Sequence, residues 1–566
     1  MRTHYCGKLN YQDIGKIVKV CGWVEKYINL GKIIFLKIRD CKGSIQIFCD
    51  YKNNISFQQA KKLRNEFCIQ VIGIIQKKIK TFKKTIEILA LKINILNKSK
   101  PLPIDLYNNK NQDIRFKYRY LDLRCPKVLK KFIIRNKITS FIRKFLEKRN
   151  FLEIETPILT KSTPEGARDY IVPSRIYKNK FYALPQSPQI FKQLLMISGI
   201  DRYYQIAKCF RDEDLRSDRQ PEFTQVDIEM SFVHSSKIRN IMEQMIKKLF
   251  KKIININLKK FKIITYDKAL LLYGSDKPDL RNPLLIIELT QFFKKTKYQK
   301  YFYLKKNNIN RVAAIHLPNK YLKNQKEIYK TIIKKNNKKK IFFIKFKNTN
   351  FKKIKIISNI KEIISQNILK EIININKIDN NDVLILIANE KNKANNKLTK
   401  LRFKLGEKLN IIKYKKWKAL WVINFPLFIK NKENKLCCTN HLFTAPKNFI
   451  LKDLEKNPEK IISDSYDLII NGYEIGGGSV RINNKNLQKK IFDIVQLKKK
   501  IQKKIFGFFT TALQYGTPPH AGIAFGLDRI TMLLTHSKSI REVIAFPKTT
   551  AAICPVSDAP INLLLK

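Results

Sequence analysis

The sequence predicts an α+β protein, in which a small β-barrel precedes segments that contain both hairpins and helices. Three observations predict this class. Residues 17–96 contain five strand-like runs and one helical stretch, residues 201–230 contain two alternating runs joined by a charged loop, and residues 465–482 contain a hairpin signal. The 566 residues suffice for about three or four domains, each with a core of its own.

Composition narrows the functional classes. The formal net charge of +69 indicates a polyanionic partner such as nucleic acid, although Lys, Ile and Asn are also abundant in segments without motifs, as compositional bias would produce. The ten cysteines form no CxxC pair, which argues against zinc and for reduced thiols. No apolar run reaches the roughly 18 residues of a membrane span, and no targeting segment is evident. We therefore expect a cytoplasmic protein.

The five N-terminal strands are predicted at 17–27, 32–40, 43–50, 67–76 and 84–96, with a helix at 54–66. Five strands with one inserted helix are typical of an OB-fold barrel. Alternation places six side chains inside: Ile34, Leu36, Ile38, Ile45, Ile47 and Cys49. The outer face then carries Phe35, Lys37, Arg39, Gln46 and Phe48. Aromatic, amide and cationic groups suit single-stranded bases, but cover by the next domain would explain the pattern equally well.

After a linker at 98–113, apolar spacing predicts a helix over 128–150, followed by a strand over 151–160 that contains Pro157. Farther on, Ser187 is a good N-cap and Pro188 a good first helical residue. This start places Gln189 and Lys192 on one helix face. A lysine that faces the interior is improbable as packing, but it suits a substrate carboxylate.

The charged loop within 201–230 joins two predicted strands. Arg211 ends the first strand, and Phe223 opens the second. A guanidinium beside an aromatic face suits a phosphate next to a flat base. A solvated hairpin tip is the alternative interpretation of such a charge run.

Asn471 and Gly472 are a two-residue hairpin signal that pairs Ile469 with Glu474 and makes Asp467 a diagonal neighbour of Glu474. Two such carboxylates either share a cation, for which Mg²⁺ is suited, or form a solvent-facing pair. The three glycines at 476–478 either let a ligand approach the backbone closely or create a bulge. A bulge is needed for Glu474 and Arg481 to face one cleft.

The segment GTPPHAGIAFGLDRITMLLT, residues 516–535, predicts a strand that enters a helix with Ile530, Leu533 and Leu534 directed inward. Arg529 lies in the first turn, where helix amides already favour anions.

The segment FRDEDLRSDRQPEFTQVDIEM, residues 210–230, resembles motif 2 of class II aminoacyl-tRNA synthetases in the version of bacterial-type aspartyl enzymes. The segment FLEIETPILT resembles motif 1 and residues 516–535 resemble motif 3, and the resemblance covers nearly the whole chain except about 284–414. It implies an OB-fold anticodon-binding domain at 1–105, a class II catalytic domain (an antiparallel sheet flanked by helices) at 106–283 and 414–566, and an inserted α+β domain at 284–413.

The resemblance further implies ligation of L-aspartate to tRNA(Asp) with ATP and Mg²⁺, by a homodimer formed around Pro157. Aspartate would be bound by Glu165, Gln189, Lys192, Arg211, His441 and Arg481. ATP would be bound by Arg211, Asp212, Glu213, Gln220, Phe223, Glu474, Gly526, Leu527, Asp528 and Arg529. Catalysis would rest on Arg211, Glu474 and Arg529, the metal on Asp467 and Glu474, and anticodon contacts on Phe35 and Gln46.

Three positions depart from or refine this pattern. Ile28 replaces a residue that is usually basic in the family, and Asn440 replaces the first His of a His-His-Pro-Phe-Thr segment. Leu30 resembles enzymes restricted to tRNA(Asp). Two alternatives remain: a sister asparaginyl- or lysyl-type synthetase, and a non-catalytic or altered-specificity relative that binds RNA.

Overall fold

The computed structural model describes residues 1–78, 85–107, 111–163, 166–294, 310–322, 341–348, 354–358, 364–431 and 433–562. These residues form two compact units. The first contains Met1–Lys137, Leu215–Gln220 and Thr535–Lys566, and the second contains Ile138–Asp214 and Pro221–Leu534. Within the described ranges, no helix has both the length and the apolar character needed to cross a membrane.

The first unit begins with a closed five-stranded barrel in the order β1-β2-β3-β5-β4. Its elements are β1 (Ile17–Asn29), β2 (Ile33–Asp40), β3 (Gly43–Asp50), α1 (Asn54–Lys61), β4 (Cys68–Lys77) and β5 (Ile86–Asn97). The predicted OB-fold is therefore confirmed. The helix is shorter than predicted: Glu66 adopts a left-handed φ of 64°, which a helix does not allow.

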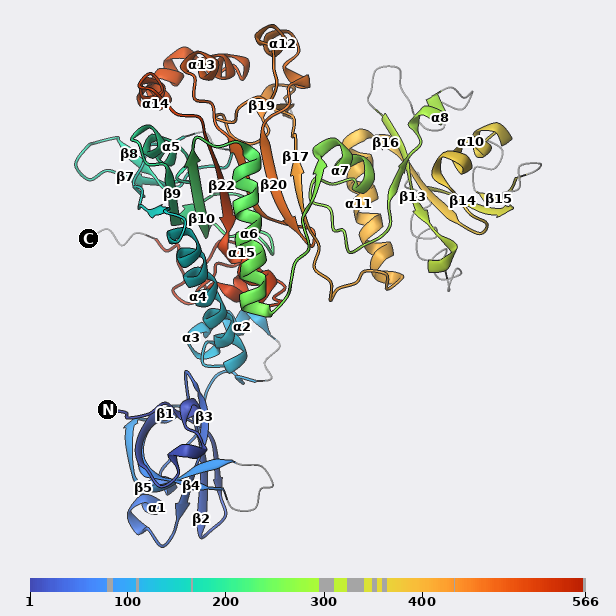
Figure 1. The fold of residues 1–566 in the computed structure, drawn as a ribbon. Helices are drawn as coiled ribbons and strands as arrows, with labels where there is room; N and C mark the ends of the chain where they lie inside the picture. Colours follow the sequence, from blue (N-terminus) through green and yellow to red (C-terminus); the bar gives the residue numbers. More distant parts are fainter. Residues whose placement is uncertain are drawn as a thin grey trace. The chain divides into compact units, whose positions relative to one another are not determined.

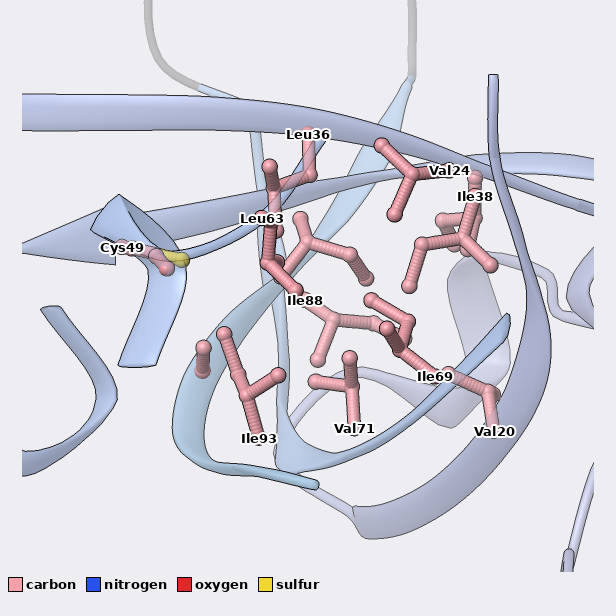
Figure 2. Packing of buried hydrophobic residues seen from close by; sticks show 14 of the residues in the cluster. Val20, Val24, Leu36, Ile38, Cys49, Leu63, Ile69, Val71, Ile88 and Ile93 are labelled. Atoms are coloured by element: carbon pink, nitrogen blue, oxygen red, sulfur yellow. The ribbon is translucent and has the colours of Figure 1, made fainter. Parts of the chain in front are cut away.

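Alternating side chains from all five strands fill the interior of the barrel (Figure 2). The six residues predicted to point inward are buried, with exposed fractions between 0% and 6%. Leu63, which follows α1, closes the core and is fully buried. Each such side chain contributes about 1.5–3 kcal/mol through burial, so the alternation determines the register of the strands.

The rest of the first unit combines three helices with the C-terminal segment. The helices are α2 (Gln112–Lys117), α3 (Arg119–Asp122) and the first part of α4 (Pro126–Glu147). Buried Arg119 donates from Nε to the carbonyl of Ala545 at 3.0 Å and from Nη2 to that of Ile544 at 3.2 Å. These hydrogen bonds attach the end of the chain to α3.

The second unit is built on an eight-stranded sheet in the order β11-β17-β20-β21-β22-β10-β9-β6 (Figure 1). The strands are β6 (Leu152–Glu153), β9 (Arg202–Phe210), β10 (Glu222–Ser231), β11 (Lys262–Thr265), β17 (Ala419–Ile423), β20 (Ser465–Ile470), β21 (Tyr473–Val480) and β22 (His520–Gly526). All neighbours are antiparallel except β11 with β17 and β6 with β9. The α+β class with an antiparallel central sheet is therefore confirmed.

Helices and two short hairpins surround this sheet. The helices are α5 (Gln189–Ile197), α6 (Ser235–Ile254), α7 (Tyr266–Tyr273), α12 (Leu451–Lys456), α13 (Lys485–Ile494), α14 (Lys499–Ala512) and α15 (Leu527–Leu534). The hairpins are β7 (Ile171–Pro173) with β8 (Phe181–Ala183), and β18 (Phe428–Lys430) with β19 (Leu436–Cys438). α6 and α15 pack together on β22, whereas α5 packs on β9 and β10 (Figure 1).

A second sheet of five antiparallel strands lies between β11 and β17 in the sequence, in the order β12-β13-β16-β14-β15. Its strands are β12 (Ile286–Glu288), β13 (Asn310–Leu317), β14 (Ile341–Asn348), β15 (Lys355–Ser358) and β16 (Val383–Glu390), accompanied by α8 (Thr290–Lys294), α10 (Gln366–Asn376) and α11 (Lys391–Lys408). The buried guanidinium of Arg402 on α11 donates to the carbonyls of Asp279, Asn282 and Leu284. The boundaries predicted at 284 and 413 stay a prediction.

Three local predictions were wrong. α5 begins at Gln189, with Pro188 and not Ser187 at the N-cap position. The strand predicted over 151–160 consists only of the two residues of β6, because Pro157 has no N–H for a ladder. In α15, Ile530 and Leu534 are buried as predicted, but Leu533 is only half-buried.

Candidate active site

A buried lysine lies between two carboxylates at the centre of the large sheet. Lys192 is the fourth residue of α5, and α5 packs on β10. Its Nζ lies 2.5 Å from Oδ1 of Asp227 and 3.2 Å from Oε2 of Glu229. The two acids are two residues apart in β10, so the alternation of the strand points both at the helix. The prediction that Lys192 faces the interior is confirmed.

Arg481, which follows β21, completes this cluster. Its Nε donates to Oε1 of Glu229 at 2.8 Å, and its Nη2 donates to Oε2 at 3.1 Å. Its Nη1 donates to Ser479 Oγ at 2.6 Å and lies 2.5 Å from Nε2 of His441. Because a guanidinium only donates, Nε2 of His441 must be the acceptor in this pair.

The electrostatics of the cluster follow from burial and pairing. Burial opposes the charge of Glu229, but Arg481 and Lys192 outweigh burial and lower the pKa of Glu229 to about 2. Burial dominates at Asp227 and raises its pKa despite the contact with Lys192. Burial and the nearby cations hold the pKa of His441 well below its usual value. His441 is therefore neutral, which lets it accept from Arg481.

Two buried polar atoms of the cluster have no hydrogen-bond partner among the described residues. They are Nε2 of Gln189 and Oδ2 of Asp227. Gln189 and Lys192 are both buried near the start of α5, as predicted. An unpaired buried donor and an unpaired buried acceptor each cost about 1–3 kcal/mol. A small ligand that carries both an anionic and a cationic group would satisfy both atoms.

A second cationic region lies at the ends of β9 and β22. The guanidinium of Arg211 lies 5.0 Å from the ring centroid of Phe223, as predicted for residues that end β9 and open β10. Arg529 lies in the first turn of α15, and its Nη1 donates to the carbonyl of Glu474 at 3.0 Å. Arg529 and Arg211 both lower the pKa of Glu474, so Arg211, Arg529 and Glu474 share one region.

The hairpin of β20 and β21 brings two carboxylates together. Ile469 pairs with Glu474, so the predicted register is confirmed. A bulge is also present, but it lies at Ile475, between this pair and the pair Leu468–Gly476, and not at the three glycines. A Cβ at Gly477 would lie 2.7 Å from Oδ1 of Asp467 and 3.5 Å from Oε1 of Glu474. Only glycine therefore leaves room for the two acids at this position.

The pKa values of the two acids shift in opposite directions. Burial and the charge of Glu474 raise the pKa of Asp467 well above its usual value. Burial also opposes ionisation of Glu474, but Lys277, Arg529 and Arg211 overcome it and lower the pKa of this carboxyl. Lys277 Nζ lies 2.6 Å from Oε2 of Glu474. The two carboxylates therefore offer oxygen ligands, and their repulsion favours a nearby positive charge, so a divalent cation would suit this position.

Residues 111–550 match the family described as tRNA synthetases class II (D, K and N). The chain belongs to the class II tRNA synthetases. Residues 18–96 also match an OB-fold nucleic acid binding domain. These matches confirm the resemblance inferred from the three motifs.

Similar proteins cover the full chain. The aspartate–tRNA ligase of Buchnera aphidicola subsp. Acyrthosiphon pisum (strain Tuc7) is 54% identical over 577 residues, with 100% of this chain and 98% of that protein covered. The aspartate–tRNA ligase of subsp. Baizongia pistaciae (strain Bp) is 50% identical, with 100% of both chains covered. The crystal structure of asparaginyl-tRNA synthetase from Pyrococcus horikoshii, complexed with asparaginyl-adenylate, has a TM-score of 0.61 at 19% identity, and 98% of this chain and 99% of that chain are covered. This last likeness concerns the fold.

Several other residues predicted for this class II synthetase site contact residues outside the two clusters. Asp212 is exposed, and its amide pairs with the carbonyl of Arg168 at 3.1 Å. Asp528 is buried and accepts from the amide of Thr224 at 2.9 Å, so its side chain attaches α15 to β10. Gln220 belongs to the first unit, where its amide group bonds the backbone of Lys548. Roles in ATP binding for these residues, and for Glu213, Gly526 and Leu527, stay predictions. Glu165 lies outside the described residues.

On the barrel, the residues predicted for the outer face of β2 and β3 differ in exposure and contacts. Phe35 is half-buried, and its ring lies 5.6 Å from that of Phe48. Gln46 donates to Glu87 at 2.9 Å. The prediction for Arg39 was wrong: only 3% of Arg39 is exposed, because its guanidinium pairs with Glu66 at 2.9 Å. Arg39 therefore belongs to the structure of the barrel and not to its outer face.

Sequence reasoning missed several residues of the class II synthetase site. Asp227 and Glu229 were not predicted as partners of Lys192 and Arg481, although their two-residue spacing in a buried strand was available as a signal. Lys277 was also missed. It follows α7 in a turn, and no sequence periodicity connects it to a hairpin almost 200 residues later.

Proposed function

We propose that this chain is an aspartate–tRNA ligase, which activates L-aspartate with ATP and transfers the aspartyl group to the 3′ end of tRNA(Asp). The observation that carries the proposal is the buried cluster of Lys192 and Arg481 beside two unsatisfied polar atoms. Full-length identity of 50–54% to proteins named aspartate–tRNA ligase supports the same reaction.

The cluster suits both ends of the amino acid. The side-chain carboxylate of aspartate is bound by Lys192 and Arg481, with His441 holding the guanidinium in place. Gln189 Nε2 donates to a carboxylate oxygen, and Oδ2 of Asp227 accepts from the ammonium group. Glu165 is proposed as a further ammonium ligand on the family resemblance. Because each unsatisfied atom gains a partner, binding removes a cost that the free protein bears.

Activation requires no general base. The α-carboxylate of aspartate has a pKa of about 3.5 and is already ionised when it attacks the α-phosphorus of ATP. The bond to the β-phosphate oxygen breaks, and aspartyl-adenylate and pyrophosphate form. Alignment and charge stabilisation then account for the rate.

Residues of the second cationic region stabilise this charge. Arg211 contacts the α-phosphate and stacks near Phe223, which supports the adenine, and Arg529 covers the other side of the nucleotide. Asp467 and Glu474 would hold Mg²⁺, which neutralises phosphate charge when bound. Asp212, Glu213 and the segment Gly526, Leu527 and Asp528 complete the part of the proposed ATP site that lies in the second unit. Gln220 is proposed as an ATP ligand on the family resemblance alone.

In the second step, a ribose hydroxyl of the tRNA 3′-terminal adenosine attacks the carbonyl carbon of aspartyl-adenylate, and AMP leaves. The barrel binds the anticodon, with Phe35 available for stacking and Gln46 for hydrogen bonds. Leu30, which is 65% exposed, supports restriction to tRNA(Asp). We assign residues 1–105 to anticodon binding, 106–283 and 414–566 to catalysis, and 284–413 to the inserted domain.

The enzyme is proposed to work as a cytoplasmic homodimer. Near Pro157 in the sequence, three apolar side chains are about half exposed among the described residues: Leu152, Ile158 and Leu159. A second copy of the chain would remove this apolar surface from water.

Charging of purified tRNA tests the proposal. The chain is incubated with ATP, Mg²⁺ and each of four combinations of aspartate or asparagine with tRNA(Asp) or tRNA(Asn). We expect product only from aspartate with tRNA(Asp). Charging of tRNA(Asn) with aspartate would overturn the restriction drawn from Leu30. Charging with asparagine, or no charging at all, would overturn the function.

A further inference from the structure

An ammonium group lies where the proposed function needs a metal ion. Lys277 Nζ is 2.6 Å from Oε2 of Glu474. Asp467 pairs with Gly477, and a Cβ at Gly477 would lie close to oxygens of both Asp467 and Glu474, so the two acids are neighbours on this hairpin. The three residues come from two distant parts of the second unit, the turn after α7 and the hairpin of β20 and β21.

We propose that Lys277 is a placeholder cation, which occupies the Asp467–Glu474 pair before Mg²⁺ and ATP bind and withdraws when the metal enters. This inference rests on the proposed function, in which the two acids hold Mg²⁺. It adds a competition between a side chain of the protein and the metal.

The Asp467–Glu474 pair is electrostatically unfavourable when no cation is near it. Two neighbouring carboxylates, of which Asp467 is only 7% exposed, repel each other and lose hydration. Lys277 places one positive charge beside Glu474, with Nζ 2.6 Å from Oε2. The lysine thus offsets the repulsion between the two acids while no metal is bound.

Lys277 and a metal ion compete for the same carboxylate. Mg²⁺ binds oxygen at about 2.0–2.1 Å and keeps several waters. An ammonium 2.6 Å from Oε2 of Glu474 already takes one of the oxygens open to a metal, and it carries a charge of the same sign. Each cation therefore weakens the binding of the other by the same factor.

The side chain of Lys277 is able to move away from Glu474. The side chain of Lys277 is 38% exposed, and it follows a turn in which Gly274 has a left-handed φ of 71°. The backbone is fixed by a hydrogen bond from the Lys277 amide to Ser275 Oγ at 3.0 Å. The backbone can therefore stay in place while the four-carbon side chain rotates into solvent.

Binding of Mn²⁺ to the nucleotide-free full chain tests the proposal without relying on activity. The metal is titrated into wild type, Lys277→Met, Lys277→Arg, Asp467→Asn and the control Lys268→Met, and free Mn²⁺ is measured by electron paramagnetic resonance. Lys268 is an exposed lysine of α7. Circular dichroism and the Tm of each variant establish that it folds.

We expect Lys277→Met to bind Mn²⁺ about tenfold more tightly than wild type, within the range of measured coupling between sites. Lys277→Arg should stay near wild type, because it keeps the charge. Lys268→Met should also bind as wild type does, and Asp467→Asn should bind more weakly. Equal or weaker binding by Lys277→Met would overturn the placeholder.

A second readout needs no variant. Acetylation of Lys277 by a water-soluble reagent, followed by mass spectrometry, should increase when wild type is saturated with Mg²⁺, while acetylation of Lys268 stays constant. Unchanged acetylation of Lys277 would also contradict withdrawal. The two hypotheses can be told apart. If the two acids do not bind a metal ion, Asp467→Asn binds Mn²⁺ as tightly as wild type. If only the placeholder role of Lys277 is wrong, Asp467→Asn still binds Mn²⁺ more weakly.

Discussion

At the scale of single residues, the site depends on a balance of buried charge. Lys192 and Arg481 face Asp227 and Glu229, and all four side chains are almost fully buried. A balanced cluster is stable without substrate, yet its orphaned atoms still favour an incoming zwitterion. Removing any one charge would therefore affect both stability and binding, so substitutions must keep these two effects apart.

Arg481→Lys separates them better than Arg481→Leu. The leucine variant leaves Glu229 with only Lys192, and breaking a buried pair costs about 3–5 kcal/mol. Lysine keeps the charge but loses the forked contact with Glu229 and the contacts with Ser479 and His441. We expect kcat/KM for aspartate in ATP–pyrophosphate exchange to fall about 10²- to 10³-fold, with little change in KM for ATP.

The same substitution at an exposed pair is the control for Arg481→Lys. Arg143 lies 2.9 Å from Glu153 and is 43% exposed, so Arg143→Lys should leave exchange unchanged. Wild-type kinetics in Arg481→Lys, or an equal loss in Arg143→Lys, would contradict the assignment of Arg481 to aspartate.

The charge of Glu229 also predicts a dependence of stability on pH. Its pKa of about 2 in the folded protein lies below the value of about 4.3 in an unfolded chain. Glu229 therefore contributes stability above about pH 4, and this contribution is lost as the pH falls through 2. The full contribution is about 3 kcal/mol, of which about half is lost by pH 3.

Urea unfolding of wild type and Glu229→Gln between pH 6 and pH 3 measures this contribution. The free energy of unfolding of the variant should lie below that of wild type at pH 6, and the gap should narrow towards pH 3. Asp227, whose pKa is raised, has the opposite pH dependence and is present in both wild type and Glu229→Gln. The difference between these two proteins therefore measures Glu229 better than either curve alone. A gap that widens with acid would contradict the pairing.

At the scale of elements, the sequence was most informative where a local rule applies. Asn471 and Gly472 adopt left-handed φ values of 52° and 85°, as a two-residue hairpin requires. These two residues alone therefore predict the strand register of Glu474. Alternation likewise identified the interior of the barrel. Long-range pairs had no such rule: Lys277 reaches Glu474, and Glu66 covers Arg39, through tertiary contacts that no periodic pattern encodes.

The barrel should be separable from the catalytic reaction. Phe35→Ala removes a stacking surface worth about 1–3 kcal/mol per base, so we expect KM for tRNA(Asp) in charging to rise about tenfold. ATP–pyrophosphate exchange should stay unchanged, because it needs no tRNA. Phe403→Ala, at a 47% exposed phenylalanine of α11, is the control and should alter neither activity. Equal loss of both activities in Phe35→Ala would contradict a separate anticodon domain.

At the scale of the whole molecule, the fold class and the family could be predicted because three long motifs are spread along the chain. The large positive charge was less informative, since it arises from lysines distributed over every segment. What identifies the reaction is instead the convergence in one unit of residues from α5, β10, β21 and α15. That convergence predicts an enzyme whose choice of amino acid is made by charge.

Amino-acid-dependent ATP–pyrophosphate exchange by the wild-type chain measures that choice most directly. Asparagine is nearly the same size as aspartate, but its amide leaves the buried cations without an added negative charge, and sites built on polar pairing reject such analogues by about 10⁴-fold. We therefore expect rapid exchange with aspartate and a kcat/KM for asparagine at least about 10⁴-fold lower. Comparable exchange with asparagine or lysine would contradict the assignment of Lys192 and Arg481 to the carboxylate of aspartate.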